Sequence, residues 1–130
     1  MKLVMLVVVG VMMAGCVTYP VAKVELTDAG NKVRVFHKTD PPISCEEIRL
    51  MTVATGKCDY NQSGAATSKW STEIGNFAAS YNLFRNEIAI AGGNAGMMEY
   101  MGPPHRTGCH LEHEIVGFAY KCPESLFIKK

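Results

Sequence analysis

Cysteine is the residue type with the most scope for covalent chemistry in this 130-residue chain. A thiol can be acylated, can form a disulfide or can bind a soft metal such as zinc. The five cysteines are Cys16, Cys45, Cys58, Cys109 and Cys122. No two of them have the C-x₂-C spacing of many structural zinc sites, so their spacing favours acylation and cross-linking over metal binding.

Chain length and net charge restrict the class to which this protein can belong. A chain of 130 residues is enough for one domain and too short for two. Its 13 basic and 12 acidic side chains nearly cancel, which argues against a nucleic-acid-binding protein, since such proteins carry a basic face. The same balance argues against an acidic, disordered chain. We therefore expect one folded domain that binds no nucleic acid.

The N-terminal segment has the pattern of an export signal. Met1 and Lys2 form a short positive end, and the next 13 residues, 3–15, are uncharged and mostly apolar. A run of this length is too short to span a bilayer, which needs about 20 residues. It has the length of the hydrophobic region of a signal peptide.

The last residues of this segment, Met13-Ala14-Gly15-Cys16, resemble the lipobox of bacterial lipoproteins. The resemblance implies removal of residues 1–15 as a lipoprotein signal peptide and acylation of Cys16, with diacylglycerol on the thiol and a chain such as palmitate on the amine. Two or more acyl chains would anchor the protein stably in a membrane. Val17 stands where aspartate would retain a lipoprotein in the inner membrane, so the resemblance implies the outer membrane and a domain that faces the periplasm. An ordinary cleaved signal and an N-terminal anchor helix are the alternatives.

Export would put the other four cysteines in an oxidising compartment, where disulfides persist. Residues 46–55 and 115–121 both have the composition of strands, and opposed residue numbers in an antiparallel pair have a constant sum. That sum is 167 for Cys45 with Cys122 and also for Cys58 with Cys109, so one register predicts both disulfides. Parallel pairing would join Cys45 to Cys109 and Cys58 to Cys122, and local pairing would join Cys45 to Cys58 and Cys109 to Cys122. We interpret the bonds as structural, with a redox-sensing pair as the alternative.

Histidines offer a weaker case for metal chemistry. His110, Glu112 and His113, together with His105, supply nitrogen and oxygen donors, but their spacing is not that of an H-E-x-x-H helix. No G-x-S-x-G nucleophile motif occurs, and paired carboxylates occur only at strand spacing. We therefore expect no catalytic residue, no metal and no bound cofactor.

Outside the signal, the chain divides into a tether, a domain and a tail. Residues 16–27 are expected to form a lipidated tether, whose free part of about 11 residues reaches at most ~40 Å. Residues 28–123 form the predicted domain and residues 124–130 a C-terminal tail. Alternating apolar residues and flanking turn signals predict strands at 32–37, 46–55, 94–101 and 111–121.

One segment has the periodicity of an amphipathic helix of about 20 residues. Its apolar residues recur at alternating gaps of four and three and are Trp70, Ile74, Phe77, Tyr81, Phe84, Ile88 and Ala91. Its opposite face carries Asn76, Ser80, Asn86 and Glu87. Ser68 or Ser71 is expected to cap its start and Gly92-Gly93 its end.

The order β-β-α-β-β predicts an α+β fold, in which one long helix packs on one face of a small, mostly antiparallel sheet cross-linked by disulfides. Small residues at Gly117 and Ala119 in the last strand would let bulky side chains of the helix approach the sheet closely.

Short motifs distributed over residues 26–123 add a family resemblance. They are Ala29-Gly30, Val33-Arg34-Val35, Cys45, Thr55-Gly56, Arg85-Asn86, Gly92-Gly93-Asn94 and Gly117-x-Ala119-Tyr120-Lys121-Cys122-Pro123. In order and spacing these motifs resemble a family of small bacterial lipoproteins, the domain of unknown function 4156. That family looks like a distant relative of RcsF, an outer-membrane lipoprotein that senses envelope stress and has non-consecutive disulfides. The resemblance also implies a bridged pair at Cys58 and Cys109, which stand where that sensor has one.

Together these inferences predict a non-enzymatic lipoprotein, held by outer-membrane lipid through acylated Cys16, whose domain binds an envelope protein partner or senses envelope stress. A purely structural envelope lipoprotein is one alternative. A periplasmic domain that binds metal through its histidines is the other.

Overall fold

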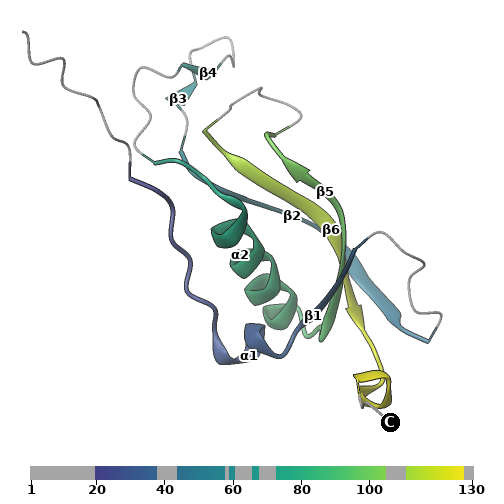
Figure 1. The fold of residues 1–130 in the computed structure, drawn as a ribbon. Coiled ribbons are helices and arrows are strands. Elements are labelled where there is room, and N and C mark those ends of the chain that lie inside the picture. Colours follow the sequence, from purple (N-terminus) through teal and green to yellow (C-terminus); the bar gives the residue numbers. More distant parts are fainter. Residues whose placement is uncertain are drawn as a thin grey trace, which may run out of the picture.

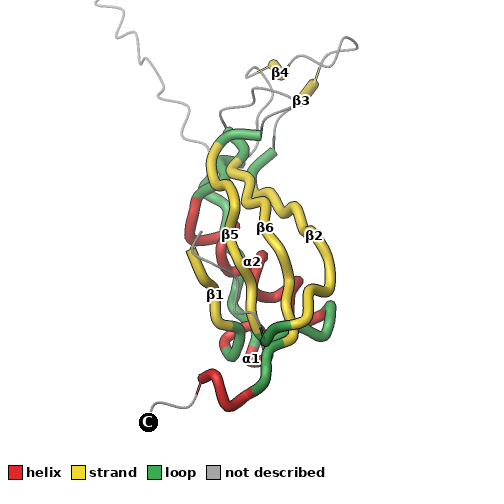
Figure 2. The backbone as a smooth tube through the Cα atoms, turned by 90° about the vertical axis from the view of Figure 1, so that its right-hand side faces the viewer, coloured by secondary structure: helices red, strands yellow, loops and turns green. Residues whose placement is uncertain are grey.

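The computed structural model describes residues 20–37, 44–57, 59–60, 66–67, 73–104 and 111–127. Within them, a four-stranded sheet carries one long helix on one face (Figure 1; Figure 2). The elements in chain order are α1 (Asp28–Asn31), β1 (Arg34–His37), β2 (Glu46–Thr55), β3 (Asp59–Tyr60), β4 (Ala66–Thr67), α2 (Phe77–Ile90), β5 (Ala95–Gly102), β6 (His113–Lys121) and the 3₁₀ helix η2 (Glu124–Phe127). The predicted α+β fold is confirmed, and β3 pairs with β4 in a separate small ladder.

The sheet has the strand order β1-β5-β6-β2 and is antiparallel except for the pair β1 and β5 (Figure 2). At the start of β2, Glu46 and Glu47 pair with Lys121 and Tyr120, in the register predicted from the cysteine numbers. An irregularity between Glu47 and Arg49 then shifts the register by one residue. The predicted register is therefore correct at the Cys45 end and wrong by one residue over the rest of β2.

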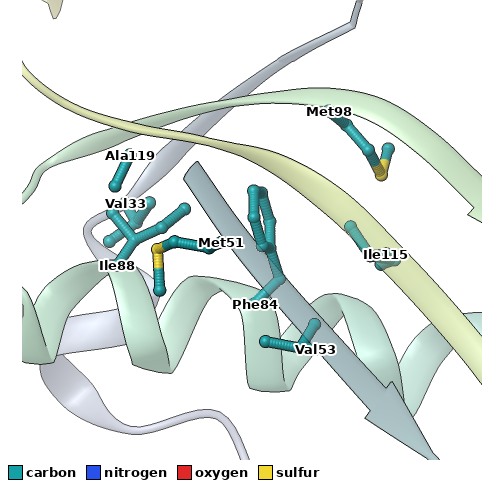
Figure 3. Close-up of a cluster of buried hydrophobic side chains, with 8 residues drawn as sticks. All are labelled: Val33, Met51, Val53, Phe84, Ile88, Met98, Ile115 and Ala119. Carbon is teal, nitrogen blue, oxygen red and sulfur yellow. The ribbon is translucent and has the colours of Figure 1, made fainter. Parts of the chain in front are cut away.

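The main core lies between α2 and the sheet (Figure 3). Phe84 and Ile88 are fully buried there, and burial of side chains of this size stabilises a fold by roughly 2–3 kcal/mol each. Glycines in the sheet make room for them. A Cβ atom on Gly117 would lie 2.8 Å from Phe84 Cζ, and one on Gly96 would lie 2.4 Å from Ile88 Cδ1. The predicted role of Gly117 is thus confirmed.

The helix begins later than its apolar periodicity predicts. Asn76, in extended conformation, caps α2 by accepting a hydrogen bond from the Ala79 N–H, so the predicted start near residue 70 is wrong. Ile74, included in the predicted helix, forms a parallel β-bridge with Val21 instead. Tertiary pairing outweighs periodicity here. The predicted caps Ser68 and Ser71, and Trp70, lie outside the described residues. At the other end, Gly92 has φ of +85° and terminates the helix as predicted.

The burial pattern of α2 also differs from the prediction. Phe77, on the predicted apolar face, is 42% exposed, whereas Asn86, on the predicted polar face, is only 8% exposed. The reason is a second layer. Residues 20–27 and α1 cover the side of α2 that faces away from the sheet (Figure 1). Both sides of the helix are therefore partly buried, one against apolar side chains and the other against backbone.

Candidate functional site

An extended segment, residues 20–27, runs along the back of α2, and we refer to it as the strap (Figure 1). At its start, the Ala22 N–H donates to the Ile74 carbonyl at 2.7 Å, and the Ile74 N–H donates to the Pro20 carbonyl at 2.9 Å. Three helix asparagines then donate side-chain N–H groups to strap carbonyls. These bonds are Asn76 to Ala22 at 2.7 Å, Asn82 to Val24 at 2.9 Å and Asn86 to Glu25 at 2.8 Å.

Asn86 also fixes the turn at the end of the strap. Its Oδ1 accepts hydrogen bonds from the Thr27 N–H at 2.9 Å and the Thr27 hydroxyl at 3.1 Å. Thr27 Oγ1 in turn accepts from the Gly30 N–H and caps α1. A Cβ atom on Gly30 would lie 2.2 Å from Asn86 Oδ1, so only glycine fits there. Residues assigned from sequence to a free tether, Pro20–Thr27, therefore belong to the folded body.

Beyond the strap, at the C-terminal end of α2, lies an open hollow of about 810 Å³ that we call the basic groove. Its lining residues come from α1, β1, the ends of α2 and β6, and η2. The labels α1 and β1 mark this region, at the lower end of the ribbon in Figure 1. The charged and aromatic side chains in its lining are Lys32, Arg34, Arg85, Lys121, Glu124 and Phe127. Four cations and one carboxylate thus share one surface of a chain whose total charge is only +1.

Two of these cations are held in fixed positions. Arg34 lies over the Phe127 ring, with Cζ 6.0 Å from the ring centroid. Arg85 lies over the Tyr81 ring at 5.7 Å and donates from Nη2 to the Asn31 carbonyl at 2.8 Å. Contacts with aromatic faces of this kind are worth about 0.5–1 kcal/mol at exposed sites. They orient the two guanidinium groups without neutralising them.

The other two cations, Lys32 and Lys121, are exposed. Within the part of the chain that the structure describes, neither forms an ion pair or a side-chain hydrogen bond. The Nε of Arg85 is buried and has no partner in the same part of the chain. The groove therefore has positive charge in excess of what the surrounding protein uses, and such a surface attracts anions.

A disulfide closes the sheet next to the groove. Cys45 and Cys122 are bonded, with their Cα atoms 4.2 Å apart, which confirms the predicted pair. The side chain of Asn94 pairs with the backbone of Cys122 as a neighbouring strand would. Its Nδ2 donates to the Cys122 carbonyl at 2.8 Å, and its Oδ1 accepts from the Cys122 N–H at 2.7 Å. Burial of the neighbouring Tyr120, reinforced by Glu47 and Glu99, raises the pKa of its hydroxyl.

A buried hydroxyl pair at the other end of α2 was not predicted. Ser80 is fully buried, lies 2.6 Å from the Thr55 hydroxyl oxygen and donates to the His113 carbonyl at 2.7 Å. No imidazole nitrogen takes part in either contact, so the arrangement is that of a structural hydrogen-bond network and not of an activated nucleophile. The signal in the sequence was a serine in the middle of a helix, which needs a partner when buried.

The histidines do not assemble a site within the described residues. The ring of His113 packs edge-on against Phe77 with centroids 6.0 Å apart, and its buried Nδ1 has no hydrogen-bond partner among the residues that the structure describes. Burial lowers the pKa of His113. Across the described residues, no three His, Cys, Asp or Glu side chains are grouped so as to hold a metal ion. His105 and His110 lie outside those residues.

The remaining predicted site residues lie outside the described residues too: Cys16, Cys58 and Cys109. The disulfide Cys58–Cys109 therefore stays a prediction, and the register shift in β2 removes the numerical argument for it. Among the helices that the structure describes, none is both long and apolar enough to cross a membrane.

Motifs that carry the family resemblance are separated in sequence but meet at the basic groove. Residues of five of them line it: Ala29, Val33 and Arg34, Arg85, Gly92-Gly93-Asn94, and Lys121. The sequence provided no means of bringing these segments together, because each comes from a different element.

Comparison with known proteins gives one group of relatives. The chain is 31% identical over 121 residues to the uncharacterized protein YjeI of Escherichia coli K12, which covers 86% of this chain and 87% of that protein. The same identity and coverage are found for YjeI of Escherichia coli O6:H1 and of Shigella flexneri. No family model and no solved structure matches the chain. By this identity and coverage, the chain belongs to the family of proteins that includes YjeI.

Proposed function

We propose that this protein is a non-enzymatic binding lipoprotein, anchored in the outer membrane through acylated Cys16, with its domain in the periplasm. The pattern of residues 1–16 supports the anchor, because a positive end is followed by an uncharged, mostly apolar run and then by Cys16. The basic groove supports a binding role, because four cations and one carboxylate line it. Membership in the domain of unknown function 4156, and through it a distant relation to RcsF, is part of the proposal.

The observation that carries this proposal is the docking of the strap. Only four peptide steps separate Cys16 from Pro20, so an acylated Cys16 would keep Pro20 within at most ~14 Å of the membrane surface. The strap starts beside Ile74, at the N-terminal end of α2, and ends beside Asn86. Since α2 has 14 residues, its other end is about 21 Å away. An anchored domain would therefore stand with the basic groove turned away from the membrane.

Intact mass of the protein extracted from outer membranes, after thiol alkylation without reductant, tests the anchor. We expect a species that begins at Cys16 and carries acyl chains, with no alkylated thiol among the other four cysteines. A Cys16→Ser variant is the matched control and should appear, unacylated, outside the membrane fraction. An unacylated wild-type protein, or equal fractionation of the two proteins, would overturn the proposal.

The proposed role in envelope stress has a separate test. The gene is deleted in its host and an envelope-stress reporter is followed after damage to the outer membrane. We expect a weakened response that returns with the wild-type gene and not with Cys16→Ser. An unchanged response in the deletion strain would remove sensing from the proposal and leave a lipoprotein that binds without signalling.

A further inference from the structure

We propose that the basic groove binds carboxylate groups of a polyanionic chain on the side of the domain turned away from the membrane, namely the peptide stems of the cell wall. The inference rests on the proposed function, because the anchor decides which side faces the wall. Two observations support the inference. The direction of the strap is one, and the other is that four cations line a single hollow, namely Lys32, Arg34, Arg85 and Lys121.

Of these cations, Arg85 serves a helix end, because its Nη2 donates to the Asn31 carbonyl at the end of α1. Basic side chains often compensate the carbonyl groups at a helix C-terminus, and the groove lies at the C-terminal ends of α1 and α2. Five of the other carbonyls at these two ends are already paired with backbone. In α2, Glu87, Ala89 and Ile88 carbonyls accept from the N–H groups of Ala91, Gly92 and Gly93. In α1, the Lys32 and Val33 N–H groups bond to the Ala29 and Gly30 carbonyls. Lys32, Arg34 and Lys121 thus carry charge that these helix ends do not use within the described part of the chain.

The two arginines are restrained by contacts with the protein before any ligand binds. A guanidinium group can bind a carboxylate through two parallel hydrogen bonds, and it loses less entropy when it is already oriented. Arg85 is oriented by Tyr81 and Asn31, and within the described residues its side chain donates one hydrogen bond, from Nη2 to the Asn31 carbonyl. Lys32 and Lys121 are exposed and add two flexible cationic side chains to the groove, which can form several weak contacts with a flexible polymer.

Distance decides between the two abundant sources of anionic groups in the cell envelope. Lipid phosphates would lie beyond the start of the strap, and the length of α2 alone puts the groove about 21 Å further away. The Debye length at physiological ionic strength is about 8 Å, so headgroup charges would be screened at the groove. Wall carboxylates would lie on the other side, toward which the groove of an anchored domain would point.

Co-sedimentation with purified cell-wall sacculi tests the proposal. The probe is the full-length acylated protein in detergent, and parallel arms use sacculi whose carboxylates have been amidated, and vesicles of phosphatidylglycerol and cardiolipin. We expect binding to native sacculi that weakens with salt and falls on the order of tenfold with amidated sacculi. Binding to vesicles alone, or binding to amidated sacculi as strong as to native ones, would overturn the proposal.

A charge-matched pair of variants assigns the binding to the groove. Lys32→Gln with Lys121→Gln removes two groove cations and should weaken sacculus binding on the order of tenfold. Lys23→Gln with Lys57→Gln removes the same charge from two exposed lysines, in the strap and just after β2, and should change binding less than twofold. Equal losses in the two variants would overturn the assignment. An acylated, membrane-bound wild-type protein that ignores sacculi would overturn this inference alone, whereas an unacylated protein would overturn the proposed function.

Discussion

Two groups of polar side chains surround α2, and the protein uses them in opposite ways. Asn76, Asn82 and Asn86 each donate to the backbone of the strap. Lys32, just after α1, and Lys121, at the end of β6, lie near the C-terminal end of α2. Neither has a bonding partner within the described part of the chain. The first group holds the fold together, whereas the second contributes charge that the fold does not consume.

Physical chemistry explains this division. A side-chain amide carries both donors and an acceptor and is neutral, so it can replace a backbone partner at a modest desolvation cost. An ammonium group only donates, and its burial without a counter-ion is far more costly. Neutral amides are therefore suited to pin one segment on another, and lysines remain at the surface, where a ligand can reach them.

The largest effect on stability should come from the disulfide, which holds β2 to β6 as the asparagines hold the strap to α2. Replacing both Cys45 and Cys122 with serine opens a loop with a sequence separation of 77 residues, and the free energy of unfolding should fall by up to about 4 kcal/mol. Urea titration measures the change, and wild-type protein treated with reductant provides the comparison. Unchanged midpoints in both would show that noncovalent contacts alone hold β2 to β6 at this end.

The next largest effect should come from Asn86→Ala. Asn86 forms three hydrogen bonds to the strap, and its loss leaves the Thr27 N–H and the Glu25 carbonyl unpaired, at about 2–3 kcal/mol. Asn82→Ala is the matched control, because it removes one bond and should cost about 1 kcal/mol. Amide exchange at Thr27 should accelerate in the first variant and not in the second. Equal destabilisation by the two variants would contradict the inference that Asn86 holds the strap more strongly than Asn82 does.

A smaller effect is expected from pH at the start of β6. Burial lowers the pKa of His113 below its usual value of 6.5 in the native protein. Between those two pKa values the unfolded chain binds a proton that the native protein does not, so stability should decrease as pH falls below about 6.5 and level off below the native pKa. Denaturant midpoints measured between pH 7.5 and 5 test this, and His113→Phe should reduce the slope. A slope that is the same in the variant would assign the pH dependence to the other histidines.

The smallest effect on stability should come from the groove. Lys32→Gln with Lys121→Gln should change the free energy of unfolding by less than about 0.5 kcal/mol, because neither side chain has a bonding partner among the described residues. The measurement is a thermal melt next to wild type. A loss near 2 kcal/mol would place these lysines with the asparagines, as parts of the fold, and would end the contrast between the two groups.

Local patterns in the sequence predicted much of the sheet and its main contacts. The bounds of β2 are those predicted, because alternation over ten residues and a turn at Gly56 are both local signals. Phe84 and Ile88 are core residues as expected, and Gly117 admits Phe84. The pairing of Cys45 with Cys122 follows from strand register, which needs only residue numbers and a direction.

The start of α2 and its second buried side could not be predicted in this way. Ile74 satisfies the helical period, yet it bonds to Pro20 and Ala22, more than fifty residues earlier in the chain. Gly75 lies in close contact with Thr55, and a Cβ atom added to Gly75 would lie 2.0 Å from the Thr55 carbonyl oxygen. Periodicity records how apolar residues are spaced along one segment and contains no information about which distant segment will bond to it.

By itself, the sequence determined the α+β class, the strand register at the disulfide and the helix core residues Phe84 and Ile88, since each depends on spacing within a short segment. Only the tertiary structure decided that the supposed tether is a strap and that cations from four elements meet in one groove. Each of those features depends on hydrogen bonds or charges brought together from distant parts of the chain, and their free energies appear only after the sheet and helix have assembled.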